Sequence, residues 1–335
     1  MKRITLGATG LVVSPVSLGC MSFGSDQWRS WVLNEPESKR LLSRALDGGI
    51  NFFDTANVYS GGISEQVLGR FLKGAVPRDQ VVVSTKVFYE TADRPGCIGL
   101  TRENIIGSLD SSLKRLGMDY VDIYQVHRWD DAVPIEDTMA ALAQVVKSGK
   151  ARFAGASNMR SWHLAKAQLA ARAIGFGGFA TMQHHFNLVY REDERDLVPL
   201  CRDQGIGLMC WSPLARGRLA HHNQTARAAI DDVADTLYGP AHDPILDDLA
   251  AVAERKGVSP AQVALAWIMA KGIVPVVGAT KDKHIDDALS AVEVVLSDSE
   301  MSQLEHAYTP RALSELPWNA KNQTNPLDMA AKLKA

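Results

Sequence analysis

Short apolar runs and amphipathic segments alternate eight times along this chain, and this alternation limits the possible folds more than any other feature. The apolar runs have the length of strands and lie at 16–19, 49–54, 81–86, 121–127, 152–156, 179–183, 206–211 and 273–277. Helical patterns follow them at 35–46, 64–73, 101–116, 134–147, 161–174 and 192–204, from residue 259 onward, and at 282–291. Eight such units in one run predict an α/β fold, the (β/α)8 barrel.

The rival α/β architecture is an open doubly wound sheet. That fold would favour a G-x-G-x-x-G motif after its first strand. Residues 19–24 read Gly-Cys-Met-Ser-Phe-Gly and lack the motif, so the barrel is favoured. Before the first barrel strand, residues 3–5 and 11–13 flank a turn at 8–10, a pattern that predicts an N-terminal β-hairpin.

Two segments do not fit the alternation. Residues 212–258 separate the seventh strand from its helix, and a helical pattern lies within them at 243–256. A connection of this length in a compact domain is usually functional or carries its own helix. Residues 308–335 extend beyond the last barrel helix, from where they are able to cover the barrel mouth. No linker divides the sequence, so we expect a single domain over residues 1–335.

The composition is that of an ordinary globular protein. Of the 335 residues, 46% are apolar and 22% are charged, and the formal net charge is -2. This balance predicts neither nucleic acid nor an acidic membrane as a partner. No long apolar segment follows the N-terminus, so we expect no signal peptide and no transmembrane helix, and a cytoplasmic location.

Cysteines and histidines show no metal-binding or disulfide pattern. None of the four cysteines forms a C-x-x-C pair, and they suit a reducing compartment: Cys20, Cys97, Cys201 and Cys210. Two pairs of adjacent histidines stand at 184–185 and 221–222. Because neighbouring side chains on a strand point to opposite faces, neither pair can chelate a metal ion on its own. We expect no metal site.

Polar residues stand where three successive strands end. Asp54 ends the second strand, Lys86 the third and His127 the fourth, and Tyr59 follows Asp54 in a loop rich in Ser and Gly. The carboxyl ends of parallel barrel strands meet on one face, where active sites collect. Any one of these residues alone is more often a helix cap or a surface ion pair, but the four together favour a catalytic site.

This set of residues suits carbonyl reduction. A phenol has an unperturbed pKa near ~10, which is high for proton donation and return at neutral pH. A nearby ammonium lowers the pKa of the phenol, a carboxylate holds the ammonium in place, and a histidine N–H can orient the substrate oxygen. We therefore expect Tyr59 to be the general acid, supported by Lys86, Asp54 and His127.

The sequence resembles the aldo-keto reductases over nearly its whole length. The resemblance is carried by residues 6–14, 54–59, 155–158 and 211–217, and the family's Asp, Tyr, Lys and His signature falls on the four residues above. Residues 127–130 and 183–188 look most like the aryl-alcohol-dehydrogenase-like branch. The resemblance implies reduction of aldehydes and ketones with NADPH, and a hairpin that closes the bottom of the barrel.

The resemblance also implies where NADP(H) would bind. Ser157, Asn158 and Gln183 would hold the nicotinamide carboxamide, and Trp211 would stack on its ring, where the family often has Tyr or Phe. Ser and Asn at a strand end are more often a helix cap, but Ser161 looks like the better cap here. A core tryptophan is the alternative for Trp211.

The rest of the expected cofactor site lies on loops. Residues 212–218 would cradle the pyrophosphate, although two arginines in a loop are usually just solvated. The expected contacts in this loop are Ser212, Pro213, Leu214, Arg216, Gly217 and Arg218, and those outside it are Gly19, Met21, Asp54, Gly278, Thr280, Lys281 and His284. The chain departs from the family at His284, which often is arginine, and at Ala288, which often is asparagine. Lys281 and Lys283 keep this end basic.

The expected substrate is an apolar or aromatic aldehyde, because aromatic residues stand in the loops near the site: Trp28, Phe88, Trp129 and Trp318. Two alternative functions remain open at this stage. Some relatives of the family bind the cofactor as regulatory or sensor subunits of membrane channels, with weak turnover. A cofactor-free isomerase or aldolase would use Lys86, a reading that Ser157 and Trp211 argue against.

Overall fold

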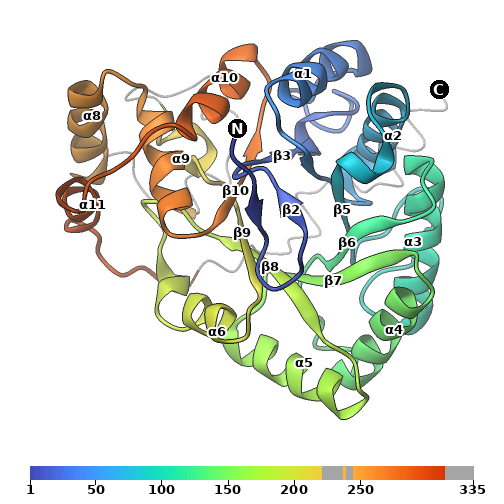
Figure 1. Cartoon of the computed structure of the whole chain (residues 1–335). Helices are drawn as coiled ribbons and strands as arrows, with labels where there is room; N and C mark the ends of the chain where they lie inside the picture. Colours follow the sequence, from blue (N-terminus) through green and yellow to red (C-terminus); the bar gives the residue numbers. More distant parts are fainter. Residues whose placement is uncertain (221–236, 239–243, 314–335) are drawn as a thin grey trace.

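The computed structural model describes residues 1–220, 237–238 and 244–313, and a closed barrel of parallel strands forms its centre (Figure 1). The barrel strands are β3 (Ser17–Gly19), β4 (Phe52–Asp54), β5 (Val82–Val87), β6 (Val121–Val126), β7 (Ala151–Ser157), β8 (Phe179–His185), β9 (Gly207–Trp211) and β10 (Val274–Gly278). β10 pairs with both β9 and β3, which closes the ring. The predicted (β/α)8 barrel is confirmed.

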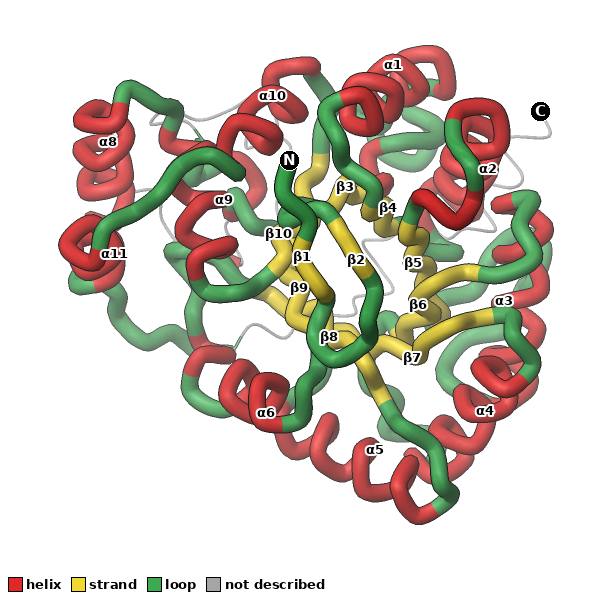
Figure 2. The backbone as a smooth tube through the Cα atoms, in the orientation of Figure 1, coloured by secondary structure: helices red, strands yellow, loops and turns green. Residues whose placement is uncertain are grey.

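Helices surround the barrel on its outside (Figure 2). They are α1 (Glu35–Asp47), α2 (Ile63–Ala75), α3 (Arg102–Leu116), α4 (Ile135–Lys147), α5 (Ser161–Ala173), α6 (Leu197–Asp203), α8 (Pro244–Lys256), α9 (Pro260–Ala270), α10 (Asp282–Ala291) and α11 (Asp298–Glu305). Several begin at clear sequence signals, such as the expected Thr101 cap of α3 and the Ser259–Gln262 capping box of α9. Among the helices described, none is both long enough and apolar enough to cross a membrane.

The predicted hairpin is present as β1 (Ile4–Thr5) and β2 (Val12–Val13), which pair antiparallel. Figure 2 shows it lying across the opening at one end of the barrel. Leu6, Leu11 and Val13 of the hairpin are buried in one cluster with strand residues such as Phe52 and Ile123. The hairpin therefore seals the end of the barrel opposite the carboxyl ends of the strands.

Strand register brings polar side chains together inside the barrel mouth. Asp54 on β4 pairs with Ser84 on β5, and Lys86 on β5 pairs with Gln125 on β6. The next residue in this row, Gly155 on β7, is a glycine for a steric reason: a Cβ there would lie 2.7 Å from Gln125 Cγ. This glycine leaves room for the Gln125 side chain to reach across the barrel interior.

Three helical details differ from the sequence prediction. The helix expected over 192–204 is interrupted: a 3-10 turn, η4 (Glu192–Glu194), precedes α6. Ser161 does not cap α5 but is its first residue, with its hydroxyl donating to Asp196 Oδ2 at 2.7 Å. The sequence prediction missed α11, although Ser297 and Glu300 form a capping box at its start.

Glu192 explains the interruption before α6. Its side chain is buried, and Oε1 accepts hydrogen bonds from Tyr308 Oη and from the Arg311 backbone N–H, both at 2.7 Å. The start of the C-terminal segment, up to residue 313, therefore docks on η4. The rest of that segment with Trp318, and most of the connection after β9 with its histidine pair at 221–222, lie outside the described residues. The helix expected at 243–256 is α8.

The close packing of α2 against α3 yields a stability prediction. A Cβ at Gly69 of α2 would collide with the Leu116 carbonyl of α3, whereas Gly74 of the same helix faces open space. We expect Gly69→Ala to destabilise the protein by ~1–3 kcal/mol through overpacking, and Gly74→Ala to stabilise it by ~0.5–1 kcal/mol through backbone entropy. Urea unfolding curves check this pair, and equal midpoints for the two variants would contradict it.

Candidate active site

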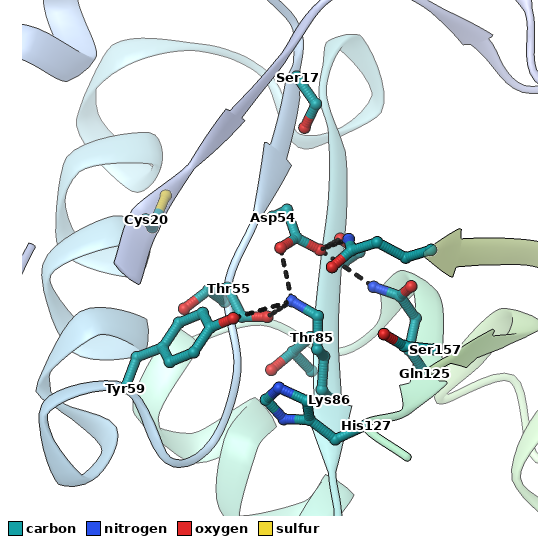
Figure 3. Close-up of polar contacts among 12 residues, drawn as sticks. Ser17, Cys20, Asp54, Thr55, Tyr59, Thr85, Lys86, Gln125, His127 and Ser157 are labelled. Atoms are coloured by element: carbon teal, nitrogen blue, oxygen red, sulfur yellow. Dashed lines mark hydrogen bonds and ion pairs between the residues drawn. The ribbon is translucent and has the colours of Figure 1, made fainter. Parts of the chain in front are cut away.

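A buried carboxylate, Asp54, is the centre of the polar cluster at the barrel mouth (Figure 3). It is 2% exposed, and its Oδ1 accepts hydrogen bonds from Ser84 Oγ at 2.7 Å and from the amides of Gln125 and Gln183, each at 3.0 Å. Its Oδ2 accepts from Lys86 Nζ at 2.5 Å. Four donors from three other strands thus surround this carboxylate with hydrogen bonds.

Lys86 points into the same cluster and is fully buried. Besides Asp54, its Nζ donates to the Thr55 carbonyl at 2.9 Å and to Tyr59 Oη at 3.5 Å. Burial by itself lowers the pKa of this amine, but the Asp54 carboxylate and the Tyr59 phenol together raise it above its ordinary value. Lys86 is therefore an ammonium at neutral pH.

Tyr59 begins the turn η2 (Tyr59–Gly62) that follows β4. The next residue, Ser60, has a φ of 50°, a left-handed conformation that is uncommon for a residue other than glycine. Burial raises the pKa of the Tyr59 phenol and outweighs the lowering effect of Lys86. The expected effect of Lys86 is present, but the net shift is upward, so the phenol carries its proton at neutral pH.

His127 follows β6, and its ring lies 5.9 Å from the Tyr59 ring in an edge-on arrangement. Burial, and then the charges of Lys86 and Arg128, hold the pKa of His127 well below its usual range. The imidazole is therefore neutral. Its buried Nδ1 has no hydrogen-bond partner among the residues that the structure describes.

Three residues of this cluster were not singled out from the sequence. Ser84 and Gln125 bind Asp54, and both follow the period of two along their strands that marks the barrel interior. Tyr89 lies beyond the end of β5, with its ring 5.1 Å from that of His127, and Asn57 Nδ2 donates to its carbonyl at 2.7 Å. Apart from its position after Phe88, nothing in the sequence indicates that Tyr89 lies at the site.

Next to His127, the amide of Asn158 connects β6, β7 and β9. Its Nδ2 donates to the His127 carbonyl at 2.9 Å and to Ser157 Oγ at 3.1 Å, and its Oδ1 accepts from Trp211 Nε1 at 2.9 Å. Its φ is 48°. The expected carboxamide contacts Ser157, Asn158 and Gln183 are thus fixed by hydrogen bonds to other site residues.

Trp211 is supported by a stack of aromatic rings. Its indole lies 4.1 Å from the His185 ring at an interplanar angle of 9°, and His185 stacks on Tyr190 at the same distance. His185 Nε2 is hydrogen-bonded to the Tyr238 hydroxyl at 2.7 Å. Trp211 remains partly exposed, so it is not a core tryptophan.

The loop after Trp211 adopts an unusual backbone. Three residues other than glycine have a positive φ, namely Ser212 (52°), Ala215 (47°) and Arg216 (57°). Such conformations cost energy and concentrate at functional sites. The partly exposed loop residues are Ser212, Leu214, Arg216, Gly217 and Arg218, while Pro213 is buried. Asn187 Nδ2 holds the Ser212 carbonyl at 2.9 Å.

At the far end of the expected cofactor site, Lys281 is the exposed N-cap residue of α10. Neighbouring charges are paired: Lys283 with Asp287 at 2.7 Å, and Asp282 with Arg40 of α1. His284 Nδ1 accepts from the Thr280 backbone N–H at 3.2 Å, which shapes the turn after the exposed Gly278.

Gly19 and Met21 are the expected cofactor contacts on β3 and on the turn that follows it. Gly19 pairs with Asp54 on one side and with Gly278 on the other. A Cβ on Gly19 would approach Val276 Cγ1 to 3.0 Å, so packing against β10 favours glycine there. Met21 lies partly exposed in the turn η1 (Cys20–Ser22).

The expected substrate-pocket residues separate into two groups. Trp28 lies 6.2 Å from the Tyr59 ring, and Phe88 lies 5.1 Å from Tyr89, which contacts His127. Trp129 stacks on His163 of α5 at 4.1 Å and makes no ring stacking contact with Tyr59 among the described residues, so its place in the substrate pocket stays a prediction. The aromatic wall near the site is therefore formed by Trp28, Phe88 and Tyr89.

This closed barrel with a buried Asp, Lys, Tyr and His cluster at its mouth is the arrangement expected from the sequence, and comparison with known proteins identifies the class of oxidoreductase to which the chain belongs. The sequence profile of the Aldo/keto reductase family matches residues 15–309. The chain therefore belongs to this family, whose members reduce carbonyl groups with nicotinamide cofactors. The resemblance predicted from the sequence is confirmed.

Individual relatives cover nearly the whole chain. Versiconal hemiacetal acetate reductase of Aspergillus parasiticus is 38% identical, over 93% of this chain and 98% of that protein. A Schizosaccharomyces pombe protein provisionally named an aryl-alcohol dehydrogenase is 39% identical, over 91% and 95% respectively. The crystal structure of a thermostable aldo-keto reductase with the inhibitor epalrestat has a TM-score of 0.75 and 28% identity, covering 92% of this chain and 100% of that one.

The described residues fit a nicotinamide cofactor at the barrel mouth. Trp211 offers a supported, partly exposed aromatic face beside the polar cluster, and the loop with positive φ angles at 212–216 follows it directly. The unpartnered Nδ1 of His127 lies in the same cluster, where a bound substrate would approach.

Proposed function

We propose that this protein catalyses the reversible, NADPH-dependent reduction of aldehydes and ketones to alcohols, with Tyr59 as the general acid. The observation that carries the proposal is the chain of contacts from Asp54 through Lys86 to Tyr59, beside a neutral His127. Bound NADPH supplies the hydride. Ser157, Asn158, Gln183, Trp211, the 212–218 loop and the 278–284 turn would hold it.

Geometry and charge support one role for each of the four residues. The protonated phenol of Tyr59 donates its proton to the carbonyl oxygen as that oxygen becomes an alkoxide. Lys86 stabilises the phenolate that remains, and Asp54 keeps Lys86 charged and in position. A neutral His127 is able to donate one N–H to the substrate oxygen without placing a third charge in the cluster.

The aromatic wall supports an aromatic or apolar aldehyde as substrate. Trp28, Phe88 and Tyr89 surround the approach to Tyr59 and His127. The name of the S. pombe relative points to aryl alcohols as well. An aldolase that forms a Schiff base on Lys86 is disfavoured, because such chemistry needs a neutral amine and the pKa of Lys86 is raised.

Assay of a panel of aldehydes and ketones with NADPH tests the proposal directly. NADPH oxidation with stoichiometric alcohol formation is the expected result. If fluorescence titration showed tight NADPH binding but no carbonyl were turned over, the cofactor-sensing function would be favoured. If NADPH did not bind at all, both the reductase and the sensor function would be excluded.

Replacing the Tyr59 phenol tests its role as the acid. Tyr59→Phe keeps the ring and its packing against Trp28 but removes the proton. We expect kcat to fall by ~10²–10⁴-fold, the usual contribution of general acid catalysis, while the Kd of NADPH stays within about twofold. Steady-state kinetics and fluorescence titration measure the two effects. Near-normal turnover would exclude Tyr59 from the mechanism.

Removing the Lys86 ammonium should change the pH dependence of the rate of alcohol oxidation. Alcohol oxidation needs the Tyr59 phenolate as a base, and Lys86 lowers the pKa of this phenol. In Lys86→Met we therefore expect the rise of the oxidation rate to move to higher pH. Asp54→Asn should have a milder effect, because it loosens Lys86 but also removes a carboxylate that raises the pKa of Tyr59. Lys114→Met, on the exposed end of α3, is the matched control. An unchanged pH profile in Lys86→Met would disprove the coupling.

Lys281 is proposed to set the preference for NADPH over NADH. It is exposed at the N-terminus of α10, where a 2′-phosphate would also meet the partial positive charge of the helix. One charge-assisted contact is worth ~1.5–3 kcal/mol, less near solvent and less at high salt. NADPH should therefore bind more tightly than NADH in low salt.

Two lysine variants distinguish a specific contact between Lys281 and the 2′-phosphate from a general effect of positive charge at this end of the site. Lys281→Ala should bring the Kd values of NADPH and NADH together, mainly by weakening NADPH. Lys283→Ala should have a smaller effect, because Lys283 already pairs with Asp287. Fluorescence titrations measure the Kd values of both cofactors for wild type and for the two variants. A ratio of NADPH to NADH Kd that Lys281→Ala leaves unchanged would place the phosphate site elsewhere.

A further inference from the structure

Arg128 is a second cation at the candidate site. It follows His127 directly, and its guanidinium carbon lies 5.5 Å from the centre of the Phe88 ring. Burial raises the pKa of the Tyr89 phenol, and the nearby positive charge of Arg128 partly offsets this rise. Phe88 and Tyr89 belong to the aromatic wall, so Arg128 is held at the edge of the pocket that this wall forms.

No carboxylate neutralises Arg128 within the part of the chain that the structure describes. The nearest acidic residues in sequence are engaged elsewhere. Asp130 accepts the backbone N–H groups of Leu100 and Ala132, and Asp131 accepts the indole N–H of Trp129. Lys86, the other cation of the site, is by contrast paired with Asp54 at 2.5 Å. Within the described residues, Arg128 therefore has no ion-pair partner at the edge of this pocket.

Contacts between aromatic rings place the Arg128 charge relative to Tyr59 and His127. The Tyr89 ring lies 5.1 Å from the His127 ring and 5.1 Å from the Phe88 ring, and the Arg128 guanidinium carbon lies 5.5 Å from the centre of the Phe88 ring. A substrate whose carbonyl lies at Tyr59 and His127 would extend along Tyr89 and Phe88 toward Arg128. A flat guanidinium with several N–H donors suits a carboxylate, which it can bind with two parallel hydrogen bonds.

We propose that Arg128 binds an anionic group on the substrate, so that the preferred substrates of this protein are aldehydes carrying a carboxylate on the far side of an aromatic or apolar spacer. This inference rests on the proposed reductase function and adds the substrate class. Because Arg128 is only partly buried, the contact should weaken as salt rises.

Matched pairs of substrates isolate the charge from size and shape. We would measure kcat/KM for 3- and 4-formylbenzoate and for the corresponding formylbenzamides, with benzaldehyde as a reference, in wild type, Arg128→Gln and Arg128→Lys. Lys114→Gln removes a distant surface cation and controls for net charge. The amides also control for folding, because a disturbed pocket in Arg128→Gln would slow acids and amides alike.

In wild type we expect at least one acid to exceed its amide in kcat/KM by about tenfold at low salt, the size of one charge-assisted hydrogen bond. Arg128→Gln should remove this preference through a higher KM with little change in kcat. Arg128→Lys should restore part of it, and Lys114→Gln should keep it.

Two results would overturn the inference. One is reduction of benzaldehyde and the amides without preference for either acid, and the other is an acid preference that Arg128→Gln leaves intact. Both leave the proposed reductase function standing. A protein that reduces none of these compounds would instead contradict the proposed function.

Discussion

The buried ion pair between Asp54 and Lys86 is the interaction on which the site depends. Burying two charges costs several kcal/mol per ion unless excellent geometry and further hydrogen bonds compensate. Here Ser84, Gln125 and Gln183 donate to the carboxylate, and the Thr55 carbonyl accepts from the ammonium. The cluster is therefore stable only when the barrel closes with the observed register, and fold and site are specified together.

A second network supports the surface on which a nicotinamide would lie. Trp211 is held by Asn158 and by the stacked ring of His185, and His185 is in turn hydrogen-bonded to Tyr238. Arg311 Nη1 donates to the Tyr238 carbonyl at 2.7 Å. Tyr238 thus connects Arg311 to the back of this aromatic stack through described contacts.

Much of the architecture was predictable because it follows from local patterns. Period-two and period-3.6 patterns indicated the barrel, and barrel geometry then placed Asp54, Lys86 and His127 on one rim. Prediction failed where contacts between residues far apart in sequence determine the local structure. The helix expected over 192–204 is interrupted because Glu192 is buried against residues 308–311.

Loop side chains were the harder part of the candidate site. Trp129, which was expected in the substrate pocket, stacks on His163, and Tyr89, which was not singled out from the sequence, has its ring 5.1 Å from that of His127. Sequence spacing does not encode the direction in which a loop side chain points, since this is set by packing between loops. The net pKa shift of Tyr59 was missed for a related reason, because the degree of burial emerges only from the assembled mouth.

The central claim is that Asp54 acts through Lys86 as one unit on Tyr59. A double-mutant cycle on kcat/KM for aldehyde reduction tests it most directly, using Asp54→Asn, Lys86→Met and the double variant, each verified as folded by unfolding curves and NADPH titration. If the pair is one unit, the double variant should be no slower than Lys86→Met alone, within about twofold. A double variant whose loss equals the product of the two single losses would show that the residues act independently and would contradict this account.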